Sequence, residues 1–164
     1  RGDAWPSERP RVAGAPPLSR QEARVQRCEW LRQSGQGQEL VDELIRDTAE
    51  AAALEARGGG GSPGLTAEYR HSLEGDSRLA AHREDVVAAN AVRAVALGAP
   101  REAALPALSA AGGDGARLIR ATAAAAGGLG EVPGAAAVRA RLAGLAELVC
   151  IASPGGEASD LAAA

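Results

Sequence analysis

Apolar residues recur with a helical period between residues 38 and 57. They fall at the spacings of a half-buried helix, and the stripe consists of Leu40, Val41, Leu44, Ile45, Thr48 and Ala52. We assign the acidic residues of this segment to the opposite, solvated face: Glu39, Asp42, Glu43, Asp47 and Glu50. This is the clearest predicted helix of the chain.

A second predicted helix precedes it, over residues 20–33. Ser19 and Glu22 have the spacing of a capping box, in which a hydroxyl and a carboxylate accept hydrogen bonds from free backbone amides at a helix start. Glycines at positions 35 and 37 end the segment. A chain never selected to fold seldom places a cap, a stripe and a stop in register, so we expect a folded protein.

Glycine and proline divide the rest of the chain into further helices. The pattern predicts a helical segment over 66–97, weakened at Gly75 and restarting at Asp76 or Ser77, followed by helices over 101–111, 114–126 and 135–151. The glycine-rich stretch 58–64 is typical of a flexible loop. No segment alternates apolar and polar residues over strand length. We therefore predict an all-α fold, a multi-helix bundle of about five to six helices with short Gly/Pro-rich loops.

The distribution of charge suggests how the chain is organised. Residues 1–18, with four prolines and mixed charges, are predicted to be a disordered lead-in, residues 19–152 a single helical domain, and residues 153–164 a flexible tail. Residues 1–102 carry 30 charged side chains, whereas residues 103–164 carry 9. Two interpretations remain open for residues 103–164. They are either the buried half of a single bundle, or a second small unit, separated from the first near residues 98–101, whose surface is buried in an assembly.

Composition limits both the core and the chemistry. The 164 residues include 40 Ala, 21 Gly, 18 Arg and 9 Pro, but no Lys, Phe or Met. The core must therefore consist of Leu, Val and Ala, and alanine contributes little at roughly 25 cal/mol per Å² of buried area. We therefore expect close helix packing and modest stability unless a partner covers more surface, as oligomerisation would. The absence of lysine excludes Walker-type phosphate loops, Schiff-base mechanisms and Ser-Lys dyads as usually built.

Net charge and hydropathy argue against two kinds of partner. The net charge of −3 and the lack of a basic patch argue against nucleic acid, and a helix-turn-helix over 103–119 would offer phosphates little beyond Arg117 and Arg120. The longest uncharged runs are shorter than the roughly 18 apolar residues of a membrane span. No charged-then-apolar leader follows Arg1, and we expect a cytoplasmic protein.

One short motif suggests catalysis or metal binding. Glu68 and His71 form a Glu-x-x-His pair, which on a helix places a carboxylate and an imidazole one turn apart, as in ferritin-like di-iron bundles. That architecture needs a second pair and two further glutamates, and His82 has the wrong spacing. The neighbouring Arg70 also favours a solvated face. We therefore predict no catalytic residue, metal or cofactor; a metal site, as the alternative, would recruit acids such as Glu43 or Asp47.

Two cysteines, Cys28 and Cys150, lie too far apart in sequence for a framework spacing. A single bridge is one interpretation, but two small buried apolar side chains is the favoured one.

The last predicted helix carries a short a/d seam. Val138, Leu142, Leu145 and Val149 recur at spacings of four, three and four, and we interpret them as an interaction face. Together with the charge-poor second part, the seam predicts a non-catalytic α-helical protein–protein interaction or scaffold module that self-associates or binds a protein partner. The alternative is a small helical metal–carboxylate enzyme or carrier, similar to ferritin, that uses the single pair Glu68 and His71.

Overall fold

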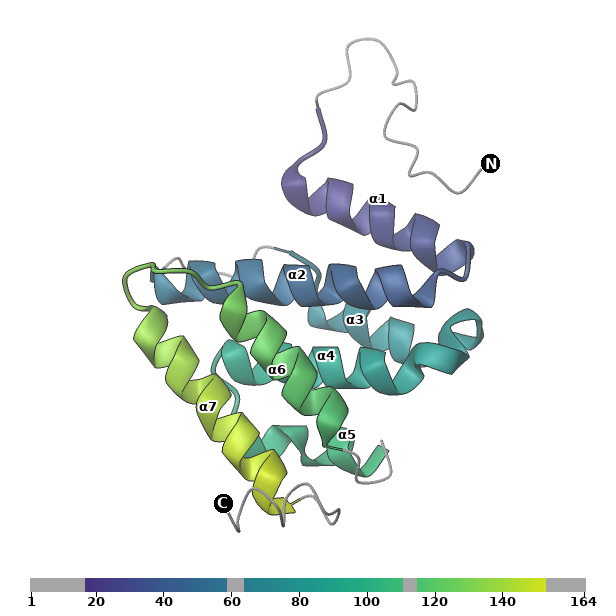
Figure 1. The fold of residues 1–164 in the computed structure, drawn as a ribbon. Helices are drawn as coiled ribbons and strands as arrows, with labels where there is room; N and C mark the ends of the chain where they lie inside the picture. The colour runs from purple at the N-terminus through teal and green to yellow at the C-terminus, as the bar shows by residue number, and fades with distance from the viewer. Residues whose placement is uncertain (1–16, 59–63, 111–114, 153–164) are drawn as a thin grey trace.

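The computed structural model describes residues 17–58, 64–110 and 115–152, and these ranges contain helices and no strand. The elements, shown in Figure 1, are α1 (Arg20–Gln33), α2 (Gly37–Ala56), α3 (Ala67–Glu74), η1 (Ser77–His82), α4 (Arg83–Ala96), η2 (Arg101–Ala104), α5 (Leu105–Ala110), α6 (Ala116–Gly127) and α7 (Ala135–Ala152), where η marks a 3₁₀ helix. The predicted all-α class is confirmed. The described residues hold seven α-helices rather than five to six. The predicted lead-in and tail lie mostly outside these ranges.

Local hydrogen bonds set the helix starts. The Ser19 hydroxyl accepts a hydrogen bond from the Glu22 amide at 3.1 Å, and the Glu22 carboxylate accepts one from the Ser19 amide at 2.9 Å, so the predicted capping box is confirmed. Thr66 caps α3 by accepting from the Tyr69 amide. The Asp76 carboxylate caps η1, which is the predicted restart after Gly75.

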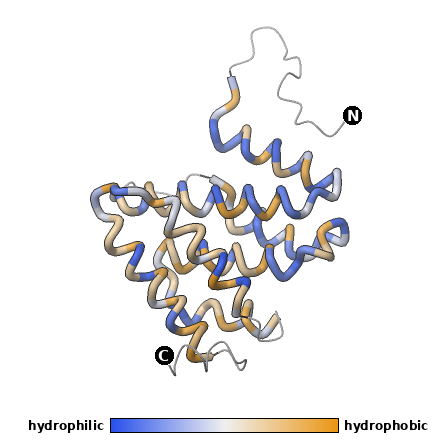
Figure 2. The backbone as a smooth tube through the Cα atoms, in the orientation of Figure 1, coloured by the Kyte–Doolittle hydropathy of each residue, from blue (hydrophilic) through white to orange (hydrophobic). Residues whose placement is uncertain are grey.

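Helix α4 is the central element of the fold. It packs against α2 and α3, which precede residues 98–101, and against α5, α6 and α7, which follow them. One apolar cluster joins the end of α2 to α4, η2, α5, α6 and α7, and a second joins α1, α2, α3 and η1 to the start of α4. Elements on both sides of the 98–101 break therefore share a core. Figure 2 shows α1 as largely hydrophilic and the half of the molecule around α5, α6 and α7 as more hydrophobic.

The turn before α7 depends on a glycine. Gly134 has a φ of +83°, and a Cβ atom on it would collide with the backbone carbonyl oxygen of Ala56 at the end of α2. The start of α7 can therefore approach the end of α2 only because residue 134 has no side chain. This contact closes the end of the bundle opposite α5.

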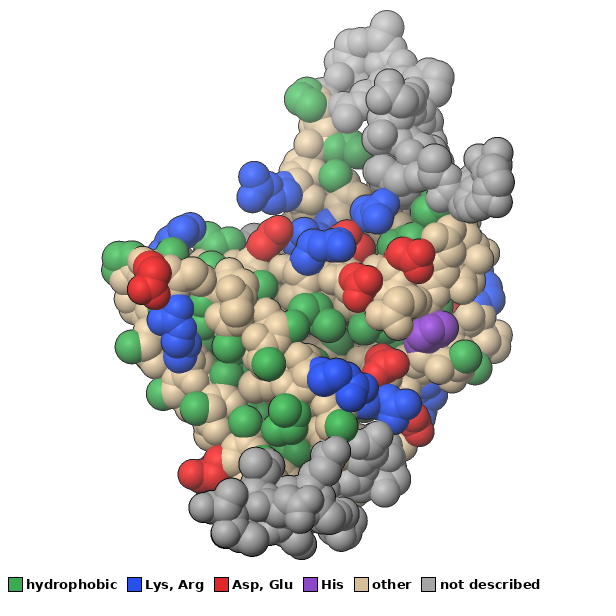
Figure 3. Space-filling model, viewed as in Figure 1, with side chains coloured by type: hydrophobic (Ala, Val, Ile, Leu, Met, Phe, Trp, Pro, Cys, Tyr) green, Lys and Arg blue, Asp and Glu red, His purple; other side chains and the backbone are tan. Residues whose placement is uncertain are grey.

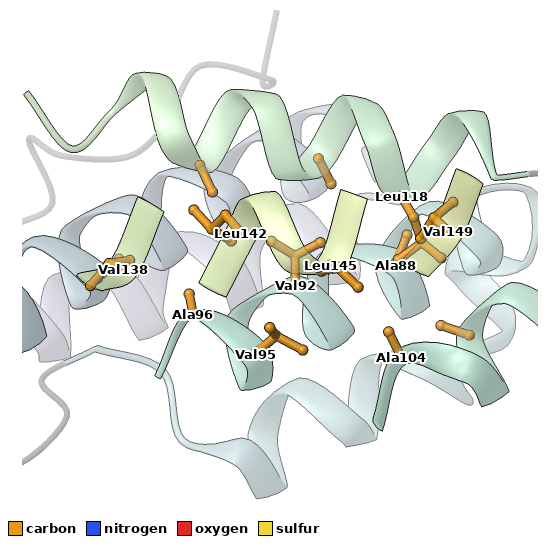
Figure 4. Packing of buried hydrophobic residues seen from close by; sticks show 14 of the residues in the cluster. Ala88, Val92, Val95, Ala96, Ala104, Leu118, Val138, Leu142, Leu145 and Val149 are labelled. Carbon is orange, nitrogen blue, oxygen red and sulfur yellow. The ribbon is translucent and has the colours of Figure 1, made fainter. Parts of the chain in front are cut away.

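The four seam residues of α7 are part of the core rather than of a surface. Val138, Leu142, Leu145 and Val149 are 0–3% exposed. Figure 4 shows Leu142, Leu145 and Val149 between α4 and α6, in contact range of the apolar side chains of those helices. The prediction that these residues present an interaction face is corrected, because the chain's own helices already cover them. A periodic apolar seam identifies the buried side of a helix but not what buries it.

Candidate functional site

A fully buried carboxylate lies among the first four α-helices. Asp47 of α2 has no exposed side-chain surface, and Arg70 Nη1 donates to its Oδ2 at 2.6 Å. Its Oδ1 accepts from the Leu65 amide at 3.2 Å and from Arg24 Nη1 at 3.3 Å, while Arg93 Nε lies 3.7 Å from Oδ2. Three arginines, from α1, α3 and α4, therefore surround one carboxylate. We call these four charged residues the Asp47 cluster.

Arg70 is the most deeply buried cation of the cluster, at 2% exposure. Its Nε donates to Asn90 Oδ1 at 2.9 Å and its Nη2 donates to Thr48 Oγ1 at 3.1 Å and to the carbonyls of Leu44 and Ala89. Burial lowers the pKa of Arg70 to about 10, which still leaves the guanidinium charged at neutral pH. A cation bound on every side in this way positions α2, α3 and α4 relative to one another.

The prediction that the acidic residues of α2 lie on a solvated face is wrong for two of them. Glu43 and Asp47 are 5% and 0% exposed, because α1 packs over this side of α2. Arg70, taken as a sign of exposure, is buried as well. The sequence did contain a signal for Asp47. It follows Leu40 by seven residues and Leu44 by three, so the helical period places it in the apolar stripe and not opposite to it.

Polar contacts continue from the cluster to a surface groove. Asn90 Nδ2 donates to Glu74 Oε2 at 2.8 Å, and His71 Nδ1 lies 3.3 Å from the same oxygen. These three residues form the polar end of a groove of about 390 Å³ between α3, α4 and α5, which we call the α3–α5 groove. Its remaining lining, apart from Arg83, is apolar: Val87, Ala91, Ala94, Ala103, Pro106, Ala107 and Ala110.

The α3–α5 groove places an imidazole beside a carboxylate, without a nucleophilic side chain among its described lining residues. A carboxylate beside an imidazole is the arrangement of an oriented general base. Among the described residues that line this groove, however, there is no hydroxyl or thiol for His71 to activate. We therefore assign no catalytic residue.

The Glu-x-x-His pair does not become a metal centre in the described part of the chain. Glu68 and His71 are both exposed, and the carboxylate beside His71 belongs to Glu74. Within residues 17–58, 64–110 and 115–152, no three His, Cys, Asp or Glu side chains are grouped as a metal ion requires. The acids that the metal alternative would recruit, Glu43 and Asp47, are bound by arginines instead.

The two cysteines are free. Cys28 is buried on α1, where burial raises the pKa of its thiol to about 12. Cys150 is half-buried on α7.

A second, shallower groove lies on the surface between α6 and α7. It has a volume of about 360 Å³, and we call it the α6–α7 groove; it is lined by Ile119, Thr122, Ala123, Ala126, Arg139, Leu142, Ala143 and Ala146. Arg139 donates to the Gly130 carbonyl and lies 3.7 Å from Glu131, so its charge is engaged by its own chain. In Figure 3, hydrophobic side chains are spread over the middle of the face that α6 and α7 form, while charged side chains gather along α1 and α2 and also at the left edge and lower right of this face.

No protein-family model, curated protein or solved structure matches this chain. Among the described helices, none is both long enough and apolar enough to cross a membrane.

Proposed function

We propose that the chain is a non-catalytic α-helical interaction module that self-associates through the α6–α7 groove. The observation that supports this proposal is the nearly apolar lining of that groove, on a chain that has no Phe or Met to enlarge its core. Exposed, contiguous apolar surface is typical of protein–protein contact. The buried seam of α7 attaches the helix that forms one wall of the groove, and Leu142 of the seam also lines the groove.

The low charge of the residues that line the groove favours a second copy of the chain as the binding partner. In a two-fold interface the same patch lies on both sides, so an unpaired charge would face its own copy and repel it. Arg139 is the one charged residue among the described groove residues, and Glu131 and the Gly130 carbonyl engage it. This contact reduces the repulsion between the Arg139 side chains of two copies that meet at the groove.

Small side chains also allow close approach. Ala123 and Ala126 on α6 and Ala143 and Ala146 on α7 line the groove with single methyl groups. The distance between packed helices is set by the side chains at their contact, so a helix of a second copy can lie close to this surface. Cys150 follows Ala146 by four residues and lies on the same side of α7, at the end of the groove.

Sedimentation of the full chain tests the proposal. We expect a concentration-dependent shift from the 16.5 kDa chain towards twice that mass, and the variant Ala143→Arg should stay monomeric because it places a charge in the groove. Ala140→Arg is the matched control: residue 140 is exposed on the same helix but lies outside the groove. It should associate like the unaltered chain.

Modification of Cys150 provides a second measurement. Because Cys150 lies at the groove end, its reaction with a thiol reagent should slow as protein concentration rises, and should not slow in Ala143→Arg. A chain that remains monomeric up to ~100 µM, where even a weak specific contact is populated, would show that self-association is wrong. Equal association of Ala143→Arg and Ala140→Arg would show that the α6–α7 groove is not the interface.

A further inference from the structure

A separate cleft of about 330 Å³ opens between α1 and α2. We call it the α1–α2 cleft, and it is lined by Arg20, Gln21, Arg24, Ala49, Glu50, Ala53, Leu54, Arg57, Gly64 and Gly128. It is distinct from the α6–α7 groove and shares no residue with it. Three of its ten described lining residues are arginines, whereas the described lining of each of the other two grooves includes one.

The single carboxylate of the cleft is already neutralised. Arg24 donates to both oxygens of Glu50, at 2.9 and 3.0 Å, and this hydrogen bonding lowers the pKa of Glu50 below its usual value. Arg20 and Arg57 are exposed, and neither lies within ion-pair distance of another described carboxylate, although the charge of Arg20 also helps to lower the pKa of Glu50. The cleft therefore keeps the positive charge of two guanidinium groups. A concave surface with an excess of one charge concentrates ligands of the opposite charge.

Two glycines fix the walls of the cleft. A Cβ atom on Gly128 would lie 2.6 Å from the Cβ of Ala49, and one on Gly64, whose φ is +112°, would collide with the Asp47 carboxylate. The Gly64 carbonyl also accepts a hydrogen bond from Gln21 Nε2 at 2.8 Å. The segments that border α2 therefore approach it as closely as a backbone can, and the cleft is shaped before any ligand enters.

We propose that the α1–α2 cleft binds a small phosphorylated molecule. Arg20 and Arg57 hold the phosphate, because the planar guanidinium presents parallel N–H groups that match phosphate oxygens. Ala53 and Leu54 contact the organic part of the ligand on the α2 wall. The volume is at the small end of ligand pockets, roughly 300–1,000 Å³, which selects a small molecule and not a macromolecule.

Titration of the ¹⁵N-labelled full chain by NMR tests this proposal, with phenyl phosphate, inorganic phosphate and phenol as probes at constant ionic strength set with chloride. We expect the amide signals of Gly64 and Gly128 to shift saturably with phenyl phosphate, more weakly with inorganic phosphate, and not with phenol. Arg20→Ala and Arg57→Ala should each weaken phenyl phosphate binding about tenfold or more, since each removes charge-assisted hydrogen bonds.

Arg120→Ala is the matched control, because Arg120 is exposed on α6 and lies outside the cleft lining. It should bind phenyl phosphate like the unaltered chain. An equal loss in Arg120→Ala, or equal shifts caused by chloride alone, would overturn the proposal in favour of general charge screening. Equal affinity for inorganic phosphate and phenyl phosphate would overturn the contact with Ala53 and Leu54. Because the Ala143→Arg variant leaves this cleft unaltered, its binding separates this proposal from self-association.

Discussion

Replacing Asp47 by asparagine removes the charge on which the first four helices converge. Asparagine keeps the size of the side chain and can still accept from the Leu65 amide, but it no longer neutralises Arg24, Arg70 and Arg93. Arg70 and Arg93 are 2% and 9% exposed, so neither can turn fully to water. Loss of one partner of a buried ion pair costs about 3–5 kcal/mol. That is a large part of the roughly 5–15 kcal/mol that keeps a domain folded.

Equilibrium unfolding in urea, followed by the circular dichroism of the helices, measures this cost. The matched control is Asp42→Asn, the same change on the same helix at an exposed position, where the carboxylate accepts from Gln38. It should change the free energy of unfolding by less than about 0.5 kcal/mol. If both variants unfold at the same urea concentration with the same slope, the Asp47 charge does not hold the helices and the reasoning fails.

A double-variant cycle separates the pair from its surroundings. Arg70→Met alone leaves Asp47 beside two arginines, whereas Asp47→Asn leaves two buried arginines without their carboxylate. We therefore expect the single change at Asp47 to cost more than the one at Arg70. The double variant should lose less than the sum of the two, with a coupling of at least about 1 kcal/mol.

Three further expectations follow from the packing. In urea unfolding, Gly134→Ala should lower the free energy of unfolding by about 3 kcal/mol or more, because its methyl group collides with the Ala56 carbonyl at the end of α2. Gly130→Ala, at φ +68° with open space around it, should lower it by about 1 kcal/mol. In a thiol assay of the native chain, Cys150 should react and Cys28, whose pKa burial raises to about 12, should react only on unfolding; equal rates would contradict its burial. Leu145→Ala should cost about 2–5 kcal/mol at every protein concentration, because Leu145 lies in the chain's own core; a cost that appeared only in the associated form would restore it to an interface.

Local patterns predicted the helices well because the hydrogen bonds that start a helix involve neighbours in sequence. The capping box at Ser19 and the glycines after residue 33 bound α1 at Arg20–Gln33, as predicted. The segment predicted over 66–97 ends its first helix, α3, before Gly75 and restarts after Asp76, as predicted, whereas the further division between η1 and α4 after His82 was not predicted. Each of these features depends on residues fewer than five positions apart.

The helical periodicity of the sequence indicates which charged residues are buried, but it does not indicate which of them pair with one another. Arg93 follows Val86 by seven residues and Ala89 by four, so, like Asp47, it interrupts an apolar stripe. Opposite charges at such positions indicate that each needs a buried partner, because an isolated buried charge is costly. Which helices meet is set by the packing of whole elements. For that reason the Asp47 cluster, which joins α1, α2, α3 and α4, became evident only in the fold.

The second part of the chain, residues 103–164, carries few charges for two structural reasons. Its described helices, α5, α6 and α7, share an apolar core with α2 and α4. In addition, its exposed surface at the α6–α7 groove remains apolar. Because the described groove residues include no aromatic side chain, a second copy would gain affinity from area and not from a few strong anchors. We therefore expect a weak dimer with a dissociation constant in about the micromolar range, seen in sedimentation as a gradual rise of mean mass with concentration. A tight dimer that persists at nanomolar concentration would show that another surface is involved.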